Sequence, residues 1–112
     1  SEHVMRDVEE QVVARPIDVV SVKGRSKGLK VYELMGLKGE VPEDREAAAK
    51  VYGAGLAAYL DRKWDEAEVA FRKTLAMLPG DAPSTIMLER CRRYRETPPP
   101  DGWDGVHRMA EK

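Results

Sequence analysis

The sequence contains no asparagine, a single cysteine and no long apolar run. One cysteine, Cys91, excludes an internal disulfide, which fits a reducing compartment and predicts a cytoplasmic location. No apolar run approaches the roughly 20 residues that a membrane-spanning helix needs, and no signal segment opens the chain, so we expect no membrane contact. The chain begins at Ser1 without an initiator methionine, which predicts a processed or excised product.

A strong net charge is also lacking. The 19 basic and 20 acidic side chains leave a formal charge of −1 over 112 residues. No global field therefore attracts nucleic acid or an anionic membrane, and any electrostatic site must be local. A chain of this length predicts one small domain, or a small domain with an appended fragment.

Residues for metal or nucleophilic chemistry are scarce. The two histidines, His3 and His107, lie at opposite ends of the chain, so no metal-ligand spacing exists and no cofactor is expected in this fragment. Cys91 lies between two arginines on an amphipathic segment, which favours a small core residue over a nucleophile. Glycine-rich phosphate loops and dinucleotide motifs are not found.

Two β-rich runs, 17–23 and 29–34, flank a glycine-bearing bend and predict a β-hairpin. Ser1 is a suitable N-cap for a short amphipathic turn before it, and Pro16 suits a strand start or edge. Both faces of the hairpin are half apolar, as in a hairpin covered on both sides within a larger sheet. Cut from such a sheet, it is expected to pack against the helices or to pair edge to edge with another copy.

Three helices are predicted over 43–60, 64–78 and 82–96, from apolar periodicity and from proline, glycine and acidic residues at their ends. The fold class is therefore α+β and mainly α: an N-terminal β-hairpin, then an α-hairpin with a third helix. Small residues permit the first two helices to pack closely. The residues expected to pack the helices or form an interaction surface are Tyr52, Gly55, Leu56, Tyr59, Trp64, Ala67 and Phe71.

The helical part resembles a tetratricopeptide repeat, with Gly55, Tyr59, Ala67, Phe71 and Pro79 near the signature positions. Arg62 departs from the repeat because it stands where glycine is favoured, and Thr74 stands where a small alanine is usual. After the prolines at 98–100, Trp103 is expected to anchor the tail by folding back onto an apolar surface.

The bend of the hairpin gathers four cations and two glycines within eight residues, an arrangement that can bind an anion or form a solvated hairpin tip. Arginines at 90, 92, 93 and 95 offer a second basic patch, although such spacing also suits a solvated helix face.

Residues 15–34 contain Arg-Pro-Ile-Asp-Val-Val-Ser-Val-Lys-Gly-Arg and then Val-Tyr-Glu-Leu. This stretch resembles the end of the catalytic domain of class III nucleotidyl cyclases. The resemblance implies that Lys23 contacts the triphosphate of the nucleotide, with Arg25 and Lys27 as weaker candidates for phosphate contact. The family's metal-binding aspartates, base-recognising residues and transition-state asparagine and arginine cannot be mapped onto this chain, so catalysis by the chain alone is not expected.

The resemblances imply four segments: 1–36, the end of a cyclase catalytic domain; 37–42, a linker; 43–97, a tetratricopeptide-like module; and 98–112, a proline-rich linker with a tryptophan-anchored tail. The expected function is that of a non-catalytic C-terminal fragment of an adenylate cyclase-like enzyme, serving regulation, interaction or dimer assembly. The parent enzyme would use Mg or Mn and convert ATP to cyclic AMP and pyrophosphate, and only the full-length enzyme would bind ATP.

Two other functions remain open at this stage. A stand-alone adaptor would capture a protein partner on its helical face. A small nucleic-acid binder would need aromatic residues interleaved with the basic ones, and only Tyr32 is near the bend. The partners expected first are a second copy of the chain or the cyclase catalytic domain, with no nucleic acid.

Overall fold

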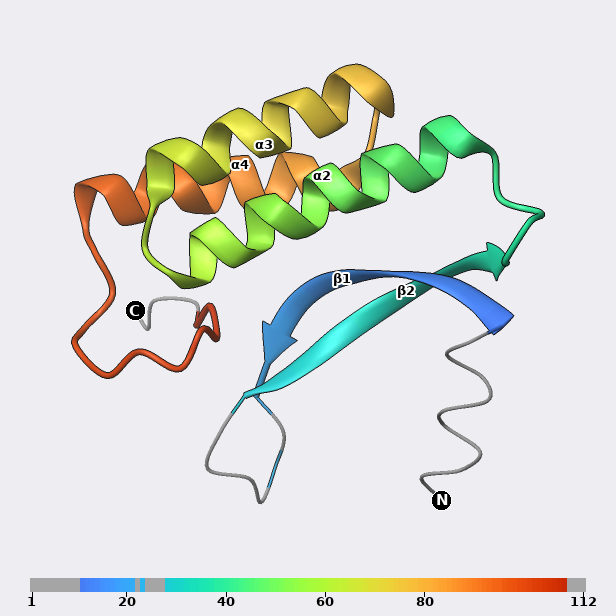
Figure 1. The fold of residues 1–112 in the computed structure, drawn as a ribbon. Helices are drawn as coiled ribbons and strands as arrows, with labels where there is room; N and C mark the ends of the chain where they lie inside the picture. Colours follow the sequence, from blue (N-terminus) through green and yellow to red (C-terminus); the bar gives the residue numbers. More distant parts are fainter. Residues whose placement is uncertain (1–10, 22, 24–27, 109–112) are drawn as a thin grey trace.

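The computed structural model describes residues 11–21, 23 and 28–108 and consists of a β-hairpin followed by three helices (Figure 1). The α+β fold class is thereby confirmed. The amphipathic turn predicted after Ser1 lies outside the described residues, as do Arg25 and Lys27.

The hairpin consists of β1 (Val12–Val20) and β2 (Leu29–Leu37), paired antiparallel in a two-stranded sheet within the described part of the chain. The predicted bounds of the first strand, 17–23, are wrong: the strand starts earlier because Val12 and Val13 pair with Leu37 and Gly36. β2 likewise continues past the predicted end at 34. Pro16 lies inside β1 next to a register shift, a position that accepts a residue without a backbone N–H.

The helices are α2 (Glu43–Leu60), α3 (Trp64–Met77) and α4 (Ala82–Glu96). The predicted bounds of α2 and α4 are correct, and α3 ends one residue before its predicted end. Glutamate and aspartate side chains occupy the first turn of α2, where they complement the positive end of the helix dipole. Figure 1 shows all three helices on one side of the hairpin, with α3 and α4 beyond α2.

The core lies between the three helices. Its buried members are Tyr52, Leu56, Tyr59, Ala67, Phe71, Met87 and Cys91. Gly55 permits this packing, because a Cβ atom there would lie 2.9 Å from Cε1 of Phe71 and 3.0 Å from Cβ of Ala70. α2 and α3 can therefore approach at this position only without a side chain.

The two strands of the hairpin differ in burial. β1 contributes Arg15 and Val19, which are buried, and Ile17, which packs against the helical core. In β2 every residue is exposed except the half-buried Met35. The expected packing of the hairpin against the helices is therefore found for β1, whereas β2 keeps its apolar side chains at the surface.

Candidate functional site

Lys23 lies exposed in the turn between β1 and β2, at the end of the hairpin. The base of this turn is tightly packed: a Cβ atom at Gly28 would lie 2.9 Å from Cγ2 of Val106 and still closer to Val19. Glycine is therefore required where the C-terminal tail crosses the hairpin. An exposed ammonium group such as that of Lys23 is suited to contact an anion such as a phosphate.

Arg15 connects the hairpin to the helices. Only 2% of this residue is exposed, and its guanidinium donates two hydrogen bonds to Asp81, at 2.9 and 3.0 Å. It donates two more to Oε1 of Glu33 on β2, at 3.1 and 2.8 Å, and lies 4.7 Å from the ring centroid of Tyr52. One side chain thus binds β2, α2 and the start of α4 to β1.

Asp81 occupies the N-cap position of α4, and its carboxylate binds other side chains. It accepts hydrogen bonds from Arg15 and, at 2.6 Å, from the hydroxyl of Ser84. Burial opposes ionisation of this carboxylate, yet these hydrogen bonds outweigh burial and lower the pKa of Asp81. Burial also opposes the charge on Arg15, but its two carboxylate partners outweigh that effect and raise the pKa of Arg15.

Two further polar contacts bind β1 to the helices. Arg90 of α4 forms an ion pair of 2.9 Å with Asp18. The hydroxyl of Tyr52 donates a hydrogen bond of 2.7 Å to the backbone carbonyl of Ile17. Together with Arg15, these contacts hold the strand that leads to Lys23 at positions 15, 17 and 18.

The basic patch considered on α4 is neutralised. Arg90 pairs with Asp18, Arg92 and Arg93 pair with Glu89, and Arg95 pairs with Glu68 and Asp65. With their charges paired inside the molecule, these arginines offer little attraction to an outside anion. The solvated-face interpretation therefore fits three of them, and Arg90 belongs to the contact with the hairpin.

An aromatic cluster joins the helices to the C-terminal tail. The ring centroid of Trp103 lies 5.4 Å from that of Tyr59, 5.3 Å from that of Tyr94 and 5.9 Å from that of Trp64. Its indole N–H donates a hydrogen bond of 2.8 Å to the carbonyl of Val106. Arg62 lies 5.8 Å from the Trp103 ring and donates to the carbonyl of Pro99, so the proline segment is attached to the end of α2.

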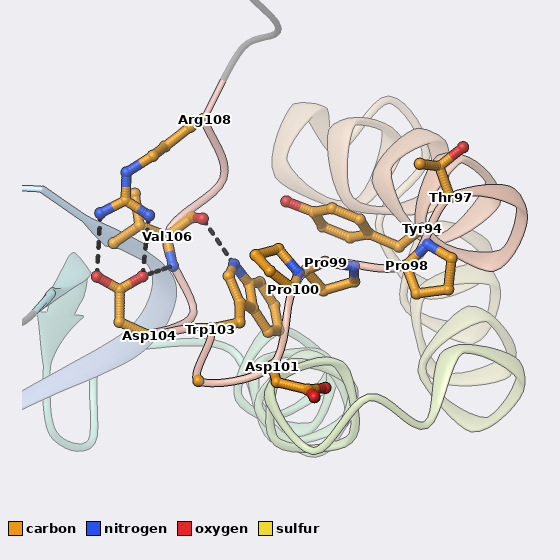
Figure 2. A pocket seen from close by; sticks show the side chains of 11 residues that line it. Tyr94, Thr97, Pro98, Pro99, Pro100, Asp101, Trp103, Asp104, Val106 and Arg108 are labelled. Atoms are coloured by element: carbon orange, nitrogen blue, oxygen red, sulfur yellow. Dashed lines mark hydrogen bonds and ion pairs between the residues drawn. The ribbon is translucent and has the colours of Figure 1, made fainter.

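An open hollow of about 470 Å³ lies between this tail and the end of α4. Figure 2 shows Trp103 and Tyr94 on its wall, with Asp104 and Arg108 bound to each other on one side. The rest of its lining comes from Thr97, the prolines at 98–100, Asp101, Gly102 and Val106. Of the charged groups on its wall, Asp104 and Arg108 bind each other, whereas Asp101 has no ion-pair partner among the described residues.

The remaining residues singled out by the sequence pack the helices. Tyr52, Leu56, Tyr59, Ala67 and Phe71 are buried, and Trp64 is half-buried against Tyr59, with ring centroids 5.6 Å apart. They occupy the interior and not a surface groove. An interaction surface on this set therefore stays a prediction.

Metal binding and thiol chemistry find no support in the described residues. No group of three or more histidine, cysteine, aspartate or glutamate side chains in residues 11–21, 23 and 28–108 is placed to hold a metal ion. Cys91 is buried, and burial raises the pKa of its thiol to about 11, so the sulfur stays protonated and unreactive. None of the helices described is both long and apolar enough to cross a membrane.

Sequence reasoning missed the roles of Arg15 and Asp81. Arg15 attracted no attention as a buried group because arginine is mostly exposed, and its partners lie 18 and 66 residues away. The left-handed backbone of Arg62, with φ of 64°, could have been predicted from the sequence. Arg62 stands where the repeat favours glycine, the residue that adopts positive φ most readily.

Comparison with known proteins adds one similarity. The chain is 31% identical over 85 residues to the terminal-differentiation-specific adenylate cyclase of Dictyostelium discoideum. The match covers 73% of this chain and 4% of the cyclase, so the chain corresponds to a short part of that protein. No family model and no solved structure matches.

The extent of the match has a structural consequence. Because 73% of the 112 residues are matched, the aligned region includes both α2 and α3 wherever it begins. The matched region is too long for the similarity to be confined to the hairpin. The chain is therefore similar to an adenylate cyclase over a region that contains α2 and α3.

Proposed function

We propose that this chain is a non-catalytic C-terminal segment of a class III adenylate cyclase-like signalling enzyme, in which the helical part serves assembly or regulation. The observation that carries the proposal is the 31% identity to an adenylate cyclase over 73% of the chain. The similarity includes α2 and α3, which favours a cyclase-related region over an unrelated adaptor. In the parent enzyme, ATP would be converted to cyclic AMP and pyrophosphate with Mg or Mn.

Lys23 is the residue through which this segment would act on the substrate. Its ammonium group is exposed in the turn of the hairpin, and β1 is bound to the helices by Arg15, Asp18 and Tyr52. A positioned ammonium group binds phosphate oxygens and stabilises the charge that develops as pyrophosphate leaves. The helices would support the strand that carries this group.

The first experiment measures cyclic AMP formation by the 112-residue chain with ATP and Mg²⁺ or Mn²⁺. We expect none, since the chain holds no group of metal-binding side chains in its described part. Turnover of ATP by the chain alone would contradict the non-catalytic role.

The second experiment uses the full-length gene product that contains this chain and compares Lys23→Ala with Lys38→Ala. Both lysines are exposed, but Lys38 follows β2 at the opposite end of the hairpin. We expect Lys23→Ala to lower kcat/KM for ATP by roughly tenfold or more and Lys38→Ala to leave it unchanged. Equal activities of the two variants would refute the phosphate contact.

A further inference from the structure

We propose that β2 is a self-association surface, through which two copies of this chain pair edge to edge. This inference concerns the chain as it stands and does not depend on a cyclase parent. It rests on the exposure of β2, on the uninterrupted edge over residues 29–34 and on the zero net charge of this strand.

The exposed apolar side chains of the molecule are concentrated on the hairpin. Leu34 is 69% exposed and Tyr32 is 56% exposed, and the other members of the group are Val20, Leu29, Val31 and Leu37. Five of the six belong to β2. Outside the hairpin, the large apolar side chains found exposed among the described residues are Val69 on α3 and Ile86 on α4.

Residues 29–34 of β2 lack the proline and the register shift that interrupt β1, and they carry one lysine, Lys30. β1 carries Pro16 and a register shift beside it, which interrupt its hydrogen-bonding edge. Residues 29–34 of β2 contain no proline, and in the two-stranded sheet that the structure describes their outer N–H and C=O groups face no further strand. Such an edge is a template for pairing with another strand.

The charges on β2 do not prevent this strand from pairing with the β2 strand of a second copy. Only Lys30 and Glu33 are charged in this strand, so its net charge is zero, and Glu33 is already bound to Arg15. The whole chain has a formal charge of −1, which produces little repulsion between copies. Because this strand has no excess of either charge, it offers little attraction to a strongly charged partner.

The exposed area also fits a dimer. The six large apolar side chains are each more than one third exposed, and they leave on the order of several hundred Å² of apolar surface spread over the two faces of the hairpin, which is within the range of the largest patch of an ordinary monomer. Two copies together approach the roughly 1,000 Å² that a specific interface needs. Antiparallel pairing of β2 with its symmetry mate would place the same strand on both sides of a twofold axis and form a four-stranded sheet.

The test compares Leu34→Lys with Val69→Lys by sedimentation of the 112-residue chain over a wide concentration range. The two side chains are matched, since they are 69% and 67% exposed, so neither substitution removes a buried group. We expect the wild-type chain and Val69→Lys to dimerise and Leu34→Lys to raise the dimer dissociation constant at least tenfold. Circular dichroism verifies that both variants keep the helical content of the wild type.

Amide hydrogen exchange gives an independent readout, in which protection of residues 31–34 should rise with concentration in the wild type. A wild-type chain that stays monomeric at high concentration would overturn the proposal, as would equal weakening by the two variants. Neither measurement involves a nucleotide, so failure here is distinguishable from failure of the cyclase assignment.

Discussion

At the scale of single residues, the least expected feature is the buried charge of Arg15. The residue stands in a stretch whose composition predicts a strand, and nothing local indicates that its guanidinium is enclosed by Asp81, Glu33 and the ring of Tyr52. Partners that are distant in sequence leave no periodic signal. By contrast, the exposure of Lys23 follows from its place in a glycine-bearing bend and agrees with the sequence-based expectation of an accessible cation.

Removing each of the two carboxylates that bind Arg15 should lower the free energy of unfolding by a different amount. Asp81→Ala should lower the free energy of unfolding by about 3 kcal/mol, because it leaves a buried guanidinium without its better-enclosed partner. Glu33→Ala should lower it by less than about 1 kcal/mol, since the Glu33 side chain is 44% exposed. Urea unfolding at neutral pH measures both values. Equal losses would show that Asp81 is not the main partner.

At the scale of elements, the helices could be predicted well and the strands less well. Helix bounds followed from Pro42, the Pro79-Gly80 pair and the prolines after Thr97, which act locally. The start of β1 could not be predicted from local signals, because Val12 and Val13 belong to the strand only through their pairing with the end of β2. Pairing between distant segments is set by tertiary structure and not by local propensity.

Two glycines in α2 provide a matched pair for testing helix packing. Gly55→Ala should destabilise the protein by roughly 1 to 3 kcal/mol, because the new methyl group would overlap Phe71 and Ala70. Gly53→Ala should instead stabilise it by about 0.5 to 1 kcal/mol, since its nearest neighbour, Cγ of Pro16, is 3.8 Å away and alanine favours the helix. Thermal or urea unfolding measures both. Stabilisation by Gly55→Ala would contradict the close approach of α2 and α3.

At the scale of the whole molecule, three segments that are distant in sequence depend on one another. The tail contacts the base of the hairpin through Val106, the hairpin is bound to α4 through Asp18, and α4 contacts the tail through Tyr94. The sequence predicted that Trp103 would fold back, but it could not indicate the surface that receives it. That surface is assembled from α2, α3 and α4 and exists only in the folded chain.

This arrangement predicts a dependence of stability on pH through His107. The Nδ1 atom of His107 lies 2.9 Å from the hydroxyl of Tyr94. Burial, followed by the positive charge of Arg90, lowers the pKa of His107 below its usual 6.5. Asp18 opposes this with a smaller effect, and Arg93 adds a still smaller lowering effect. The folded state therefore favours the neutral ring, and this contribution to stability is present above pH 6.5 and is lost as the pH falls through the folded-state pKa.

The measurement is the free energy of unfolding between pH 7.5 and 5 for the wild type and for His107→Gln, whose side chain does not titrate. We expect the wild type to lose stability toward acid more steeply than the variant, because only the wild type has a ring to protonate beside Arg90 and Arg93. Parallel curves for the two proteins would contradict the role of His107. Any titration of His3 contributes equally to both proteins and cancels in the comparison.

Because the sulfur of Cys91 is buried, its reactivity can report opening of the helical core. Because this thiol is the single one in the chain and is both covered and protonated, a thiol-reactive dye can modify it only after α4 separates from the other helices. The rate of dye incorporation then measures how often the helical core opens, without a substituted residue.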